Sequence, residues 1–142
     1  MGLLLSGGRQ VAAEEKVGAP DEPAHARRVL VDQSLKLDSA KAVKFWPLYE
    51  HYQKELDHFR KARLDLLSNM GENYDNMSDS DAAKIIAERL HIERGRVELM
   101  EKTIRDMSSI LSQRELARFL QIELKIKAFI DAGIEEEIPI LQ

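Results

Sequence analysis

The chain has 142 residues, of which 44% are hydrophobic, 32% are charged and only 6% are aromatic, a mixture that favours long helices over sheet. Its formal net charge is -4, and the acidic and basic residues are interspersed, so no basic block indicates a nucleic-acid partner. The absence of cysteine excludes disulfides, thiolate metal ligands and cysteine nucleophiles. No apolar run approaches the roughly 18 residues of a spanning helix, so we expect no membrane insertion.

The first residues differ in character from the rest. Residues 1–20 are expected to be a disordered leader or the remnant of a signal peptide. The Leu-Leu-Leu run followed by small residues resembles the end of a signal peptide, but no basic segment precedes it. Residues 21–142 are expected to form a single helical domain. A short helix is predicted at its start, with Asp21 as N-cap and Pro23 tolerated in the first turn.

Residues 37–70 are predicted to form one long amphipathic helix. Its buried side chains recur with alternating steps of four and three residues, the period of a seam that packs along a partner helix over many turns. The seam consists of Phe45, Tyr49, Tyr52, Leu56, Phe59, Arg63, Leu66 and Met70. Pro47 removes a backbone donor inside this helix, so we expect a kink near Val43.

A polar turn at residues 71–77 is predicted to lead into a second long helix, which runs antiparallel beside the first. Its seam consists of Ala83, Ile86, Leu90, Glu93, Val97, Met100, Ile104, Met107 and Leu111. Gly95 lies inside the helix at a cost of about 1 kcal/mol relative to alanine. Each seam carries one polar residue, Arg63 and Glu93, and the pattern allows a buried or half-buried ion pair between them, which would fix the register.

The last helix is predicted to run from Ser112 to about Glu137, where Pro139 ends it. Its stripe consists of Leu116, Phe119, Ile122 or Glu123, Ile126 and Ile130, continued by Ile134 and Ile138. The predicted fold class is therefore all-α, a long antiparallel helical hairpin with a shorter helix at each end. We expect a homodimer, because the two short helices would leave apolar surface on a hairpin of this length.

Three of the predicted helices begin with the same local pattern. At residues 111–116 (Leu-Ser-Gln-Arg-Glu-Leu), the serine can cap the backbone, Glu115 can reach back, and the flanking leucines form a hydrophobic staple. Residues 77–82 follow this plan with a shorter acid. Residues 37–42 follow it imperfectly, because Lys41 cannot accept the return hydrogen bond. Each cap contributes on the order of 1 kcal/mol, so helix stability alone explains the pattern.

The chain resembles the Spy/CpxP family of periplasmic stress proteins, in which two Leu-Thr-x-x-Gln signatures each open a helix. Residues 37–41 and 111–115 look like degenerate copies, which lack Thr at the second place and Gln at the fifth. The stretches LDSAKAVKFWPLYEHYQKEL, MSDSDAAKII and ILSQRELARFLQIELKIKAFI also resemble exported relatives of this family. The likeness covers about residues 25–141.

The resemblance implies a helical protein, often an antiparallel dimer, without catalytic residues. Family members act as ATP-independent holdase chaperones, as inhibitors of envelope stress sensors or as periplasmic metal sensors. It therefore implies unfolded or regulatory protein partners and a periplasmic location, with a signal peptide that is truncated or absent in this chain; a cytoplasmic location is the alternative. The sequence itself shows no Gly-rich phosphate loop and no nucleophile elbow, so we expect neither an enzyme nor a cofactor.

A second functional hypothesis is a metal-responsive sensor or scavenger. His51, Glu55 and His58 share one strip of the first long helix, and His91 falls at a comparable height on the antiparallel helix. Imidazoles and a carboxylate in this arrangement would suit Zn, Cu, Ni or Co ions. The competing interpretation is an ordinary solvated flank.

Aromatic residues provide candidates for a partner or dimer surface, namely Trp46, Tyr49, Tyr52 and Phe59. Tyr49 and Tyr52 lie on the seam, so core packing is the competing interpretation for them. Trp46 is off the seam by one residue and is the better surface candidate. A third hypothesis, a helical scaffold or interaction module without chaperone activity, requires only such a surface.

Overall fold

The computed structural model describes residues 22–138, so the predicted leader, the Asp21 cap and the stop at Pro139 lie outside the described residues. Four α-helices follow one another in this part of the chain: α1 (Glu22–Leu35), α2 (Ser39–Glu72), α3 (Asp79–Met107) and α4 (Gln113–Glu135). A short 3₁₀ turn, η1 (Tyr74–Asn76), connects α2 to α3. Residues 22–138 contain no strand, which confirms the predicted all-α class.

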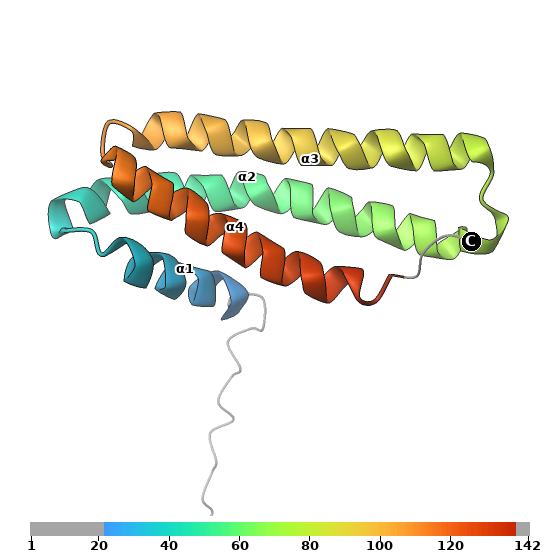
Figure 1. Ribbon diagram of the computed structural model, residues 1–142, viewed down its shortest axis with the longest axis horizontal. Coiled ribbons are helices and arrows are strands. Elements are labelled where there is room, and N and C mark those ends of the chain that lie inside the picture. Colours follow the sequence, from blue (N-terminus) through green and yellow to red (C-terminus); the bar gives the residue numbers. More distant parts are fainter. Residues whose placement is uncertain (1–21, 139–142) are drawn as a thin grey trace, which may run out of the picture.

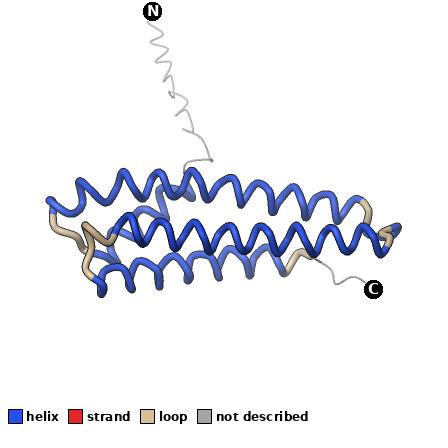
Figure 2. Tube along the Cα trace, turned by 90° about the horizontal axis from the view of Figure 1, so that it is seen from above, coloured by secondary structure: helices blue, strands red, loops and turns tan. Residues whose placement is uncertain are grey.

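The helices form an elongated bundle. α2 and α3 lie side by side and run in opposite directions, while α4 returns obliquely across them (Figure 1). The view from above shows the same elongated arrangement (Figure 2). α1, with 14 residues, is the shortest helix and lies beside α4. It therefore covers only part of the length of the bundle.

The beginnings of α2 and α4 are joined by an ion pair. The predicted capping box of α4 is present. The Glu115 carboxylate accepts a hydrogen bond from the backbone N–H of Ser112 at 2.9 Å, and the Ser112 hydroxyl accepts one from the backbone N–H of Glu115. In α2, Asp38 accepts from the Lys41 backbone N–H at 2.9 Å. The Lys41 ammonium, which cannot complete a box, donates to Glu115 Oε1 at 2.7 Å. The residues at the same place in the two caps thus pair across the bundle.

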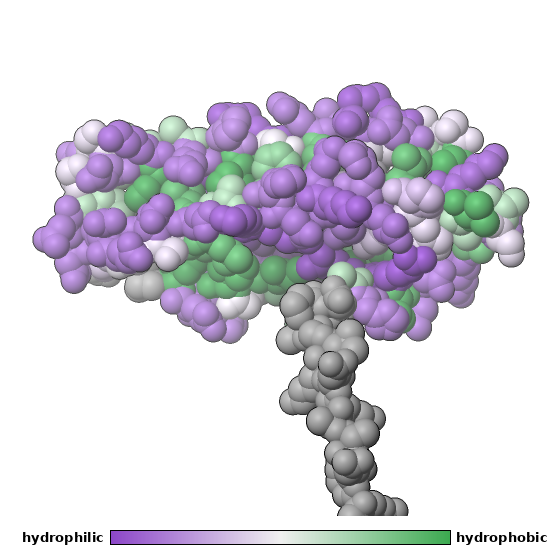
Figure 3. All heavy atoms as spheres, turned by 180° about the vertical axis from the view of Figure 1, so that it is seen from behind, coloured by the Kyte–Doolittle hydropathy of each residue, from purple (hydrophilic) through white to green (hydrophobic). Residues whose placement is uncertain are grey.

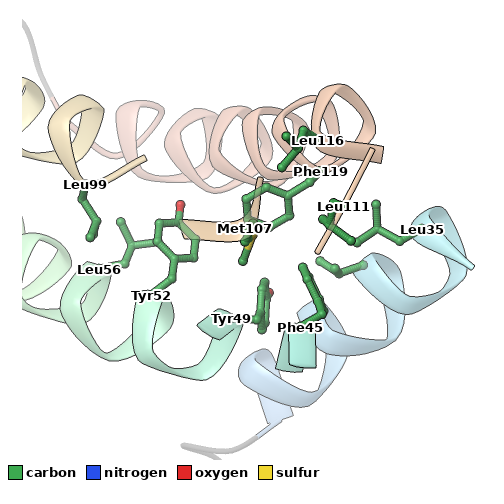
Figure 4. Packing of buried hydrophobic residues seen from close by; sticks show 11 residues of the cluster. Leu35, Phe45, Tyr49, Tyr52, Leu56, Leu99, Met107, Leu111, Leu116 and Phe119 are labelled. Atoms are coloured by element: carbon green, nitrogen blue, oxygen red, sulfur yellow. The ribbon is translucent and has the colours of Figure 1, made fainter. Parts of the chain in front are cut away.

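The hydrophobic core lies at this end of the bundle. Phe119 is fully buried and reaches from α4 toward three aromatic rings of α2 (Figure 4). Its ring centroid lies 5.9 Å from that of Phe45, 6.3 Å from Tyr49 and 6.0 Å from Tyr52. All three pairs meet edge to face, the arrangement that aromatic quadrupoles favour. Phe119 therefore fixes the first half of α4 on α2.

The predicted seam of α2 agrees with the structure. Its buried residues are Phe45, Tyr49, Tyr52, Leu56, Arg63 and Leu66. The predicted seam of α3 is correct only at its C-terminal end, where Met107 and Leu111 are 0% and 4% exposed. Its earlier part is wrong in its face, because Ile86, Leu90 and Val97 are 61%, 51% and 58% exposed. The residues that are buried are Ile92, Leu99, Thr103 and Met107. Before Met107, α3 carries two strips with similar spacing, and the contact with α2 selects the one that the sequence pattern did not.

Gly95 allows α3 to approach α2 closely. A Cβ atom at this position would lie 2.4 Å from Cε1 of Phe59 on α2, well inside contact distance. The glycine that lowers helix propensity is therefore needed for packing.

We predict that Gly95→Ala destabilises the fold by about 1–2 kcal/mol, because the overlap with Phe59 outweighs the gain in helix propensity. The free energy of unfolding in urea measures the effect. Gly133→Ala is the matched control, since nothing lies within 4 Å of a Cβ at Gly133 in α4. The control should stabilise by about 0.5–1 kcal/mol. A Gly95→Ala variant at least as stable as the wild type would contradict the packing role.

Candidate functional site

A groove of about 430 Å³ lies between α2, α3 and α4, a volume within the usual range for binding sites. Its apolar walls include Val97, Met100 and Ile104 from α3, and Leu120, Leu124 and Ile130 from α4. Three residues of the groove are each more than half exposed, namely Leu64 of α2, Val97 of α3 and Leu124 of α4. The groove is thus an apolar surface open to solvent. Figure 3, which colours the surface by hydropathy, shows apolar patches between bands of polar side chains on one face of the molecule.

Six charged side chains from α2, α3 and α4 form a closed ring of ion pairs, and four of the six also line the groove. In order round the ring they are Arg63, Asp131, Lys127, Glu93, Arg89 and Glu135. Arg63 of α2 is only 2% exposed and contacts both Asp131 and Glu135 of α4. Three positive and three negative groups alternate, so the ring is neutral while all six are ionised. It therefore ties the second half of α4 to the other two helices.

The ring replaces the ion pair that the two seams allowed between Arg63 and Glu93. Glu93 instead lies 3.2 Å from Arg89 and 3.8 Å from Lys127. The physical reason is that α4 brings Asp131 to Arg63. The expected pair with Glu93 was inferred from the seams of α2 and α3 alone, without this third helix. Burial raises the pKa of Asp131, but hydrogen bonds from Lys127 and Arg63 outweigh it, so that its pKa lies below the usual range.

Glu123 of α4 is a buried acid between the aromatic core and the ring. It is 5% exposed, and burial raises its pKa more than the nearby Tyr49 hydroxyl, Arg27, Arg60 and Tyr52 lower it. Within the described residues, neither Glu123 Oε1 nor the Tyr49 hydroxyl has a partner at full hydrogen-bond geometry, although the two side chains are close enough to interact electrostatically. The sequence pattern predicted that either Ile122 or Glu123 lies in the buried stripe of α4. In the structure the buried residue is Glu123. An ionised Glu123 therefore costs folding free energy.

The groove also contains a cation without a close acidic partner. Among the basic residues that line it, Arg60 pairs with Asp57 at 2.6 Å, and Arg63 and Lys127 belong to the ring. Arg96 of α3 lines the groove as well but makes no hydrogen bond or ion pair within residues 22–138. The half-buried Arg96 has a lowered pKa, because burial disfavours its charged form.

The predicted metal ligands are not gathered into one site. His51 Nε2 lies 2.7 Å from Glu55 Oε1, while His58 and His91 are both exposed. Within residues 22–138, no group of three or more His, Asp or Glu side chains is arranged to hold a metal ion. The metal-sensor hypothesis therefore stays a prediction from the sequence.

The predicted surface aromatics have different positions. Tyr49 and Tyr52 are 3% and 4% exposed, so they pack in the core, the alternative that their seam position indicated. Phe59 is partly buried against the core. Trp46 is also partly buried, and the Arg28 guanidinium of α1 lies 4.3 Å from its ring centroid, a cation–π contact. Trp46 thus helps to hold α1 on α2, and of the four rings only Tyr52 lines the groove.

A scan of protein-family models and searches of curated proteins and of solved structures found no match to the chain. None of the helices within residues 22–138 is long and apolar enough to cross a membrane. We therefore infer function from the groove and from the resemblance seen in the sequence.

We predict that Glu123→Gln stabilises the fold at pH 7 by about 1–2 kcal/mol, because it removes a buried charge with an unsatisfied oxygen. Since the folded state raises the pKa of Glu123, the penalty of its ionisation grows as the pH rises through that pKa. The gain should therefore be smaller at pH 4 than at pH 7. Urea unfolding at both pH values measures it.

Glu98→Gln, at an exposed position on α3, provides the matched control and should change stability by less than about 0.5 kcal/mol. A loss of stability for Glu123→Gln at pH 7, or a gain that is the same at both pH values, would contradict a buried carboxyl group whose pKa is raised by folding.

Proposed function

We propose that this protein is a periplasmic, Spy/CpxP-like stress protein that holds apolar segments of unfolded or regulatory partner proteins without ATP. The observation that carries the proposal is the open groove between α2, α3 and α4. Leu64, Val97 and Leu124 remain 55%, 58% and 53% exposed in it. A contiguous apolar surface of this kind usually marks a place where another molecule binds.

The walls of the groove suit loose and reversible binding. Fully burying an exposed Val or Leu side chain contributes about 1.5–3 kcal/mol. Leu64, Val97 and Leu124 are each about half exposed, so covering what remains of the three contributes about 2–5 kcal/mol in total. Ordering two molecules offsets much of this free energy. Met100 adds an adaptable side chain that accommodates different shapes. The contacts are non-directional, so a holding function for varied apolar segments fits them better than recognition of one rigid ligand.

We further propose that α2 and α3 act as an antiparallel hairpin that pairs with a second copy of the chain. The apolar side chains of Ile86 and Leu90 on α3 are 61% and 51% exposed and do not line the groove. They belong to the strip that the sequence pattern predicted to be buried. A homodimer that covers Ile86 and Leu90 would leave the groove free for partners.

The holding function predicts that the protein suppresses the aggregation of a chemically denatured client at a near-stoichiometric ratio and without nucleotide. Light scattering after dilution from denaturant measures the suppression. In the double variant Val97→Gln/Leu124→Gln, about tenfold more protein should be needed for equal protection, because two apolar contacts are lost.

The control Val43→Gln/Phe129→Gln changes two positions that are 76% and 84% exposed and lie outside the groove. It should protect the client as well as the wild type does. Absence of suppression by the wild type at large excess would overturn the chaperone form of the proposal, and equal losses in both double variants would overturn the assignment to the groove.

The dimer prediction is tested by sedimentation equilibrium. The wild type is expected to have twice the mass of one chain, whereas Ile86→Gln/Leu90→Gln should shift toward the monomer, because the covered apolar strip becomes polar. The groove variant Val97→Gln/Leu124→Gln should remain dimeric. A monomeric wild type at the highest soluble concentration would contradict the homodimer.

A further inference from the structure

Arg96 differs from the other cations of the groove in what surrounds it. Arg96 lines the same groove as the apolar residues Val97, Met100 and Leu124. Glu93 and Asp131 attract it only at longer range, and Arg60 repels it. Both of these acids already have closer partners in the ring. The charge of Arg96 is therefore half-withdrawn from water without a hydrogen-bonded acid to replace the water.

A carboxylate is the group that best completes such a site. A guanidinium binds a carboxylate through two parallel N–H donors, and such charge-assisted hydrogen bonds are about twice as strong as neutral ones. The other acids of the groove oppose this only weakly. Glu101 is exposed at the edge, and Glu123 is buried with a raised pKa.

We propose that the groove selects apolar protein segments that carry an acidic side chain, whose carboxylate pairs with Arg96. This inference rests on the proposed holding function and adds a preference to it. The apolar walls supply affinity for any apolar segment, whereas Arg96 distinguishes an acidic segment from a neutral or basic one. The occupant is thus a stretch of a partner chain with Asp or Glu next to branched aliphatic residues.

Three short synthetic peptides test the preference. They share one apolar sequence and differ only at a central residue, which is Asp, Asn or Lys, and fluorescence anisotropy of the labelled peptides measures their affinity at physiological ionic strength. We expect the Asp peptide to bind about tenfold more tightly than the Asn peptide, and the Lys peptide to bind most weakly. The formal charge of the whole chain is -4, so non-specific attraction would produce the opposite order.

Substitutions on α3 assign the preference to one side chain. Arg96→Gln should bind the Asp and Asn peptides equally, whereas Arg96→Lys should keep part of the preference for Asp. Arg94→Gln makes the same change of charge two residues away at an exposed position outside the groove, and it should behave like the wild type. Circular dichroism and urea unfolding confirm that each variant is folded before its affinity is compared.

The outcomes separate the two proposals. The role of Arg96 is overturned if the three peptides bind the wild type equally, or if the preference for Asp survives in Arg96→Gln. Neither result contradicts the holding function. Failure of every peptide to bind overturns the holding function and this inference together. Loss of the preference in Arg96→Gln, with its retention in Arg94→Gln, supports the carboxylate contact.

Discussion

The structure depends on the attachment of α4 to α2 at two separated points, which differ in chemistry. The first is the fully buried Phe119, which packs against three aromatic rings of α2. The second is Arg63, 2% exposed, which binds two acids of α4. Loss of the first removes apolar contacts, whereas loss of an acid from the second leaves a buried charge without its partner, which is strongly destabilising. Both attachments are therefore needed to keep α4 across the other two helices.

The groove is a consequence of this oblique attachment. α4 must be amphipathic enough to bury Phe119, yet its other apolar residues, such as Leu124 and Ile130, face a space that neither α2 nor α3 fills. The short α1 lies beside α4 and does not line the groove. The same region contains Glu123 with an unsatisfied oxygen and Arg96 without a close partner. Two features that do not favour folding thus lie in the lining of the groove.

The seam of α2 and the helix caps were predictable from sequence, because each depends on residues close together in the chain or on one periodic strip. The face of the earlier part of α3 was not. Ile86, Leu90 and Val97 repeat with a helical period as regular as that of the buried Ile92 and Leu99, and only the position of α2 distinguishes the two strips. The groove also could not be predicted from the sequence, because it depends on how three helices are placed relative to one another. Gly95 offered one signal, because a glycine inside a strong helical pattern often marks a close approach of two helices.

The helix starts add a physical observation to the resemblance in sequence. The two segments that resemble the family signature depart from it at the fifth place, where Lys41 and Glu115 stand. These two departures are complementary, since the Lys41 ammonium donates to the Glu115 carboxylate at 2.7 Å. Glu115 also completes its own capping box, so one carboxylate both starts α4 and contacts the start of α2. Changing either residue alone would break a pair, so the two degenerate copies are better understood as one structural unit than as two eroded motifs.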